Sequence, residues 1–335
     1  ARLRLGEVLL RQESFGEAEA LYRDYLKSKP KSPDAPLAQY NLAYAVYRQG
    51  REEEAVELFR EVARLDPRGD IGGAALLEVG RWAQDKHKYA DARQAYQEYL
   101  RNRGDTIEAA QAWWGVGEAS FQLSDWSRAE DALRSLIDKF PNHTLVERAY
   151  YRLVDVYRKL GRADEAEQVS AALRKRFPES GLTAAALLAD GREAFKSRQY
   201  PRAVELFELF LKQHPEHQEG PKATANLAAS LYLAGDLPDH WQRAADLYAE
   251  LGRKHPAIAP DAFFWAGSAY LEAGKASKAV DALQIFLKSQ PGNTYAPRGQ
   301  LLLGRALVAL ENYPEAVETL RQAVKSAGDD ASLKA

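Results

Sequence analysis

Metal-ligating and phosphate-binding residues are sparse in this sequence. The nearest approach to a metal pair is His214 and His217, which flank Pro215 and Glu216. A segment that contains proline offers no helical face on which two histidines lie four residues apart, and no third ligand is near. Gly72-Gly73 lacks the Lys-Ser/Thr that completes a phosphate-binding loop. We therefore expect no metal, no cofactor and no catalytic site, and a chain that is not an enzyme.

Aromatic and arginine side chains form a second group, because these residue types most often anchor a bound protein. They recur at steps that place them on one face of a helix. The candidates for a partner-binding groove are Tyr40, Asn41, Tyr44, Tyr47, Arg48, Trp114, Glu118, Phe121, Arg148, Tyr151, Arg152, Asp155, Arg158, Arg192, Phe195 and Lys196. The same positions also suit packing between helices, and a surface arginine is often only solvated, so both interpretations stay open.

The composition is that of a globular protein and argues against several kinds of partner. The chain has 335 residues, and its 46 Lys and Arg nearly balance its 48 Asp and Glu. We therefore expect no binding of nucleic acid and no attraction to an anionic membrane. No apolar run approaches the roughly 18 residues that cross a bilayer, so direct membrane insertion is not expected. Cysteine and methionine are both absent, and the missing initial Met leads us to expect a piece of a longer protein.

The elements that position these side chains recur with a period of 37 residues. The period is marked by Pro30, Pro67, Gly104, Pro141, Pro178 and Pro215. It slips once, because the segment 235–241 is four residues longer than its counterparts. A constant period of this length indicates a repeat array rather than two unrelated domains.

Each period carries two helical patterns. Apolar residues recur at steps of three and four over 113–120 and again over 129–136, before Pro141 ends the second pattern. Proline ends a helix because it lacks the N–H that would continue the hydrogen-bond ladder. No strand pattern occurs, so the sequence predicts helical hairpins throughout.

Two positions in each period hold small residues. The first set is Gly6, Ala43, Gly80, Gly117, Val154, Gly191, Ala228, Gly267 and Gly304, in which Val154 is the departure. The second set is Ala18, Ala55, Ala92, Ala129, Ala166, Ala203, Ala244, Ala279 and Ala316. With an aromatic residue or Leu four positions after the alanine and a proline twelve after it, this pattern resembles the tetratricopeptide repeat.

The resemblance implies an all-α fold, a right-handed superhelical solenoid of about nine helical hairpins. The units would cover residues 1–30, 36–67, 73–104, 110–141, 147–178, 184–215, 221–256, 260–291 and 297–328 as a single array, with 329–335 a tail or the start of a truncated capping helix. Stacking of such units makes one continuous core. Glycine inside a helix costs about 1 kcal/mol relative to alanine, so its recurrence predicts a close approach by the neighbouring helix.

The 37-residue length of the unit indicates a resemblance to particular members of this family. The usual unit of this family is shorter than 37 residues, and here the additional residues follow the proline. The next helix opens with patterns such as Ala38-Gln39-Tyr40-Asn41-Leu42. This style is similar to bacterial cell-envelope members of the family, namely the Tol–Pal coordinator and the lipoprotein subunit of the β-barrel assembly machine. It favours the periplasm, or association with the outer membrane, over the cytoplasm.

These observations lead to one main hypothesis and two alternatives. The main hypothesis is a non-enzymatic scaffold that binds a protein or peptide on its concave face, within an envelope complex. The alternative is a structural spacer or subunit that uses convex loops and the ends of the array, with further association expected through an uncapped C-terminal unit. An RNA-binding helical repeat is disfavoured by the acidic sequence pI of about 6.4.

Overall fold

The computed structural model describes residues 2–235 and 237–326, and every regular element in them is an α-helix. Contacts divide the chain into two compact units, residues 1–177 and 178–335. The first unit contains α1 (Arg2–Arg11), α2 (Phe15–Ser28), α3 (Ala35–Arg48), α4 (Glu52–Leu65), α5 (Asp70–Asp85), α6 (Tyr89–Arg103), α7 (Ala109–Gln122), α8 (Trp126–Lys139), α9 (Val146–Lys159) and α10 (Ala163–Arg176). The second contains α11 (Gly181–Lys196), α12 (Tyr200–Gln213), α13 (Gly220–Leu233), α14 (His240–Lys254), α15 (Ala262–Glu272), α16 (Ala276–Ser289), α17 (Ala296–Ala309) and α18 (Tyr313–Ser326). Gly328 and the predicted tail lie outside the described residues.

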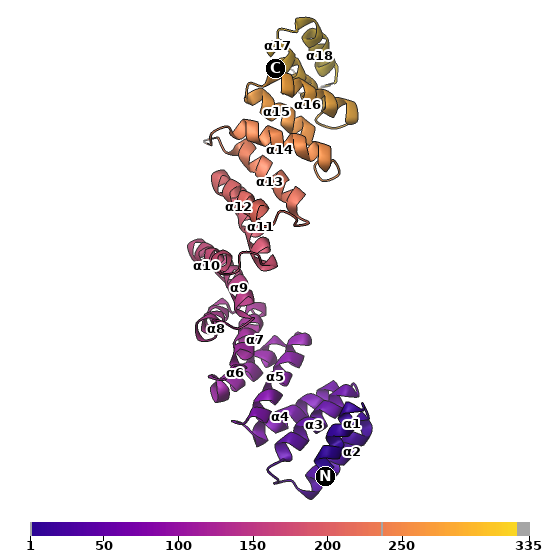
Figure 1. Ribbon diagram of the computed structural model, residues 1–335, viewed down its shortest axis with the longest axis vertical. Coiled ribbons are helices and arrows are strands. Elements are labelled where there is room, and N and C mark those ends of the chain that lie inside the picture. Colours follow the sequence, from indigo (N-terminus) through magenta and orange to yellow (C-terminus); the bar gives the residue numbers. More distant parts are fainter. Residues whose placement is uncertain (1, 236, 327–335) are drawn as a thin grey trace. The chain divides into compact units, whose positions relative to one another are not determined.

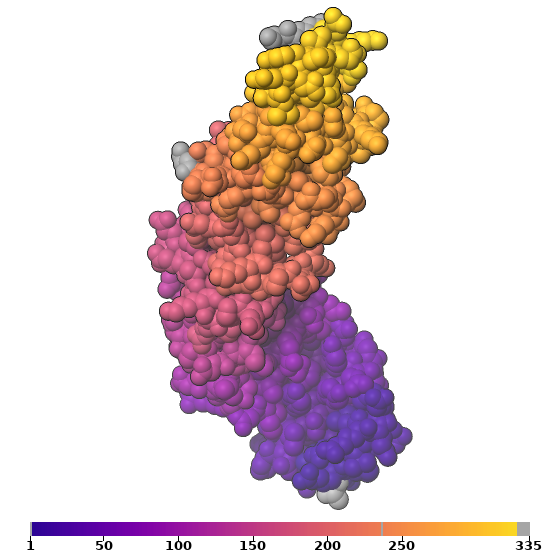
Figure 2. Space-filling view, turned by 45° about the horizontal axis from the view of Figure 1, so that its top comes forward, coloured from indigo at the N-terminus to yellow at the C-terminus, as the bar shows by residue number. Residues whose placement is uncertain are grey.

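Within each unit the helices form a row of antiparallel hairpins (Figure 1). Within each unit each helix packs against the next one in the sequence, and several first helices of neighbouring hairpins also touch, as α3 touches α1 and α5. Figure 2 shows the colour changing steadily along each unit, so residues close in the sequence lie close together in space. The predicted all-α hairpin repeat is therefore confirmed.

The two helices of each hairpin are joined by a turn with a residue of positive φ, and the longer turn between α13 and α14 contains both Gly235 and Asp239. Glycine occupies this position at Gly50, Gly161 and Gly274, with φ between 70° and 82°. Elsewhere a residue with a side chain adopts the same conformation, as His87 does with φ 57°. The turn therefore recurs with the repeat even where its glycine does not, which the sequence pattern did not reveal.

The four-residue insertion is held by the start of α14. The His240 ring is buried, and its Nδ1 donates to the carbonyl oxygen of Leu231 at 3.0 Å. Trp241 packs edge-on against Tyr232, with ring centroids 4.8 Å apart. The inserted residues therefore lead into a packed helix start.

Close approach at the small residues is confirmed. Each alanine of the second set is buried. A Cβ atom placed on Gly80 would lie 2.5 Å from the ring of Tyr96, and one placed on Gly115 would also overlap that ring. Tyr96 on α6 therefore fills space that one glycine on α5 and another on α7 leave open.

Val154 on α9 is larger than the Gly or Ala at the matching position of the other hairpins, and Ser170 on α10 is smaller than its counterparts. Ser170 stands where the other second helices carry Tyr, Phe or Leu, and both Val154 and Ser170 are buried. A larger residue on α9 thus accompanies a smaller one on α10, which conserves volume in that hairpin. The hydroxyl of Ser170 accepts a hydrogen bond from Arg174 at 2.9 Å.

Replacing Gly80 by alanine should destabilise the chain, because the new methyl group overlaps the buried Tyr96 ring. We expect the free energy of unfolding to fall by about 1–3 kcal/mol, measured by urea denaturation. The matched control is Gly16→Ala on α2, whose Cβ would meet nothing within 4 Å. This control should be neutral or stabilising by up to about 1 kcal/mol. Equal stabilities for the two variants would contradict the packing role of Gly80.

The Val154 and Ser170 departures should be energetically coupled. Ser170→Phe alone should overpack the hairpin, and Val154→Gly alone should leave a void. Together they restore the pattern of the other hairpins, so the double variant should be more stable than the sum of the single effects predicts, by roughly 1–2 kcal/mol. A double-mutant cycle from denaturation curves measures this term, and strict additivity would show that the two positions do not share a contact.

Candidate binding groove on the first helices

The sequence-predicted groove residues come from four first helices. Tyr40, Asn41, Tyr44, Tyr47 and Arg48 lie on α3, and the rest of those before residue 178 lie on α7 and α9. Arg192, Phe195 and Lys196 lie on α11, in the second unit. There Arg192 pairs with Glu219 at 3.3 Å, and Phe195 packs edge-on against Tyr200.

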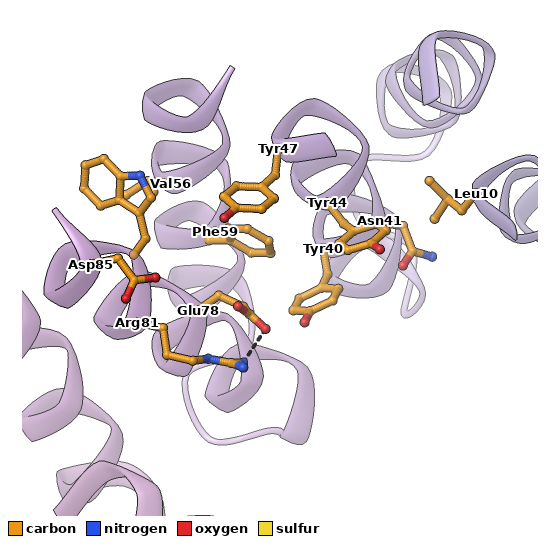
Figure 3. Close-up of a pocket in the computed structure, with 11 residues that line it drawn as sticks. Leu10, Tyr40, Asn41, Tyr44, Tyr47, Val56, Phe59, Glu78, Arg81 and Asp85 are labelled. Carbon is orange, nitrogen blue, oxygen red and sulfur yellow. Dashed lines mark hydrogen bonds and ion pairs between the residues drawn. The ribbon is translucent and has the colours of Figure 1, made fainter. Parts of the chain in front are cut away.

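Four of the α3 residues line a cavity of about 500 Å³, which we call the tyrosine pocket. Its lining consists of Leu10, Tyr40, Asn41, Tyr44, Tyr47, Val56, Phe59, Glu78, Arg81, Trp82 and Asp85. Figure 3 shows the tyrosines of α3 on one side and Glu78, Arg81 and Asp85 of α5 on the other. Tyr44 and Tyr47 keep 36% and 41% of their surface exposed, so a partner can reach them.

Several contacts hold the aromatic wall in place. Tyr40 packs edge-on against Phe59 at 5.2 Å between ring centroids, and Asn41 Nδ2 donates to the Tyr22 hydroxyl at 3.1 Å. Arg48 donates to the Tyr44 hydroxyl at 2.7 Å and stacks over the ring of Phe15. Burial raises the pKa of Tyr40, and the charge of Glu78 adds to the rise, so the phenol stays neutral and can donate.

A second cavity of about 500 Å³, which we call the tryptophan cavity, adjoins the first. It is lined by Leu77, Arg81, Gln84, Asp85, Tyr96, Gln111, Trp114, His143, Thr144, Leu145 and Arg148. The guanidinium of Arg148 lies over the Trp114 ring at 4.8 Å. Arg81 and Asp85 line both cavities, so the two cavities lie next to each other along α3, α5, α7 and α9.

The remaining candidates on α7 and α9 are tied to one another. Arg152 forms ion pairs with Glu118 and Asp155, the latter at 3.3 Å, and stacks over Phe121 at 4.5 Å. Burial works to lower the pKa of Arg152, but the hydrogen bond to Glu118 and the charges of Glu118 and Asp155 together raise it above its usual value. Asp155 also pairs with Arg158 at 3.5 Å. The stretch that looks basic in sequence is therefore largely neutralised within the protein. Among the described residues, Tyr151 makes no hydrogen bond, ion pair or ring contact through its side chain.

Sequence reasoning missed the α5 side of the groove. Glu78, Arg81 and Asp85 lie 37 residues after Asn41, Tyr44 and Arg48, so the period itself marks them. Trp82 has no such counterpart, because the matching position on α3 is Ala45. The predicted groove contained residues of α3, α7, α9 and α11 but none of α5.

His214 and His217, the nearest approach to a metal pair in the sequence, lie in the second unit, where their rings are close together. The rings of His214 and His217 have centroids 6.4 Å apart, and His217 Nδ1 accepts the backbone N–H of Glu219. Burial lowers the pKa of His214, and the charge of His217 adds to this. Among residues 2–235 and 237–326, no three His, Cys, Asp or Glu side chains lie close enough to hold a metal ion. Over the same residues, no helix is long and apolar enough to cross a membrane.

Several solved structures are similar to this chain. They include MamA from Desulfovibrio magneticus RS-1, at 16% identity over 52% of this chain and 92% of that one, with a TM-score of 0.41. PilF of Pseudomonas aeruginosa is 19% identical over 67% and 96%, with a TM-score of 0.44. A tetratricopeptide repeat protein from Parabacteroides merdae is 15% identical over 78% and 96%, with a TM-score of 0.44. Comparison with curated protein sequences gave no match.

Family models account for most of the chain. One tetratricopeptide repeat model matches residues 3–70, 80–144, 188–240 and 296–334, which is more than half of the sequence. A second model of the same repeat matches residues 148–180 and 261–293. Proteins with this repeat generally mediate protein–protein interactions, and the fold is typically a non-catalytic scaffold. The chain belongs to the tetratricopeptide repeat family.

Proposed function

We propose that this chain is a non-enzymatic scaffold that binds an extended segment of a protein partner. The segment would lie in the groove formed by the tyrosine pocket and the tryptophan cavity. This groove follows the first helices of residues 2–177, and in this repeat family the first helices chiefly line the concave face.

The continuity of the groove carries this proposal. The two cavities share Arg81 and Asp85, so a chain lying in one would continue directly into the other. Tyr44 and Tyr47 expose rings at one end, and Trp114 carries a stacked arginine at the other. Aromatic side chains and arginine bury much area on binding at low cost in side-chain entropy, which suits them to anchor a partner.

The contacts also determine which substitutions would test the groove without weakening the fold. Arg152 holds Glu118 and Asp155, so its reversal to Glu would place three carboxylates together and weaken the fold as well as the surface. Tyr44 and Tyr47 are partly exposed, so their truncation removes contact area with little loss of core packing.

We also propose a setting in the bacterial cell envelope, in the periplasm or at the outer membrane. The repeat length of 37 residues and the Ala-x-Tyr-x-Leu-like helix openings support it. A partner there would itself be an envelope protein.

Truncating both exposed tyrosines should weaken binding. Peptides selected from a random display library against the full chain should bind a Tyr44→Ala, Tyr47→Ala variant at least roughly tenfold more weakly, since two anchors are lost. Fluorescence anisotropy with the selected peptides measures this change. The matched control is Tyr313→Ala on α18, a tyrosine with 58% exposure in the second unit, which should bind as the parent does. Equal affinities for all three proteins would rule out the groove.

The envelope setting is tested by fractionating the source cell. An antibody to this chain should find it with periplasmic or outer-membrane markers. Recovery with cytoplasmic markers instead would contradict the setting but leave the groove untouched.

A further inference from the structure

Asp85 is a carboxylate without a partner in the groove. It lines both cavities, it is exposed, and within residues 2–235 and 237–326 its carboxylate takes part in no hydrogen bond or ion pair. It is also the last residue of α5. The C-terminus is the negative end of the helix dipole, so the end of α5 adds to the charge of Asp85. The position therefore favours a nearby cation.

The cations around the tyrosine pocket are already engaged elsewhere. Arg81 pairs with Glu78, and Lys86 pairs with Glu52 at 2.7 Å. Arg48 is held by Tyr44, Phe15 and, at 3.4 Å, Glu13. Lys88 lies over the Trp82 ring at 4.5 Å. None of these side chains forms an ion pair with Asp85, and neither does Arg148, which lines the tryptophan cavity and lies over Trp114. The charged lining of the tyrosine pocket is Glu78, Arg81 and Asp85, so this pocket keeps one negative charge in excess.

The rest of the lining also suits a cation. Tyr40, Tyr44, Tyr47 and Trp82 present aromatic rings, whose faces attract positive charge. Trp82 is buried and already carries Lys88 over its ring, so the partly exposed rings of Tyr44 and Tyr47 are the ones that a partner's cation can reach. Asn41 uses its amide nitrogen on Tyr22, which leaves its carbonyl oxygen to accept from a partner.

We propose that the tyrosine pocket receives a basic side chain, Lys or Arg, of the bound protein segment. The cation would lie among the aromatic rings and pair with Asp85, with its aliphatic stem against Leu10 and Val56. The proposal rests on the proposed function and adds to it the chemical class of the residue recognised. The volume of about 500 Å³ is ample for one such side chain together with part of its backbone.

The experiment compares matched peptides on matched variants. Peptides are selected from a random display library with the full chain, and the tightest basic peptide is resynthesised with its Lys or Arg replaced by the uncharged norleucine. On the parent protein this change should weaken binding roughly tenfold, as expected for a cation lost from an aromatic and carboxylate site. Isothermal titration calorimetry gives both dissociation constants.

Two variants separate the pocket from general electrostatics. Asp85→Asn keeps the shape of the side chain and removes its charge, so on this variant the basic and norleucine peptides should differ by less than about threefold. The control is Asp91→Asn on α6, which removes the same charge from an exposed carboxylate outside the groove. It should retain the full tenfold difference. An undiminished difference on Asp85→Asn would overturn the proposal.

Other outcomes distinguish this inference from the proposed function. Selected peptides that depend on Tyr44 but carry no basic residue would overturn the basic-residue assignment alone. Enrichment of acidic peptides that are lost with Arg148→Gln would overturn it in the same way. If the library yields no peptide that depends on Tyr44 and Tyr47, the groove itself fails and both proposals fall.

Discussion

The structure depends on the close approach of neighbouring helices at small residues. Tyr96 shows how this works, because its ring fills the space beside Gly80 of its own hairpin and Gly115 of the next. One side chain thereby joins the two helices of a hairpin and joins that hairpin to its neighbour. In the α9–α10 hairpin the corresponding space is filled by a larger residue on the first helix, Val154, and a smaller one on the second, Ser170. Packing density, rather than residue identity, is what the repeat preserves.

This packing leaves one face of the first helices free. The second helices direct their large side chains against the glycine and alanine positions, so Tyr44, Arg81 and Arg148 lie on a surface that the core does not use. Helices placed this way cannot shift far without opening the core. The groove is therefore carried on a rigid support, which limits the entropy lost when a segment binds.

Internal pairing then selects which charges remain for a partner. Arg152, with Glu118 and Asp155, forms a network that stabilises the contact of α7 with α9. Asp85 and Arg148 make no ion pair in the part of the chain that the structure describes. Among the Asp, Glu, Lys and Arg residues that line the two cavities, these two retain the capacity to recognise an opposite charge, because Glu78 and Arg81 pair with each other. The exposed Tyr44 and Tyr47 of α3 add contact area for a partner rather than charge.

The sequence by itself determined the helices, the hairpins and the close contacts, because each depends on partners within one 37-residue period. It also placed Tyr40, Asn41, Tyr44 and Tyr47 on one face, since helical phase is local. A single array over residues 1–328 stays a prediction. Only the tertiary structure decided that Arg152 is bound to Glu118, 34 residues away, and that Asp85 lies unpaired between two cavities. Such pairing depends on distances between side chains of different hairpins, and these distances follow from how the hairpins pack, which periodicity alone does not specify.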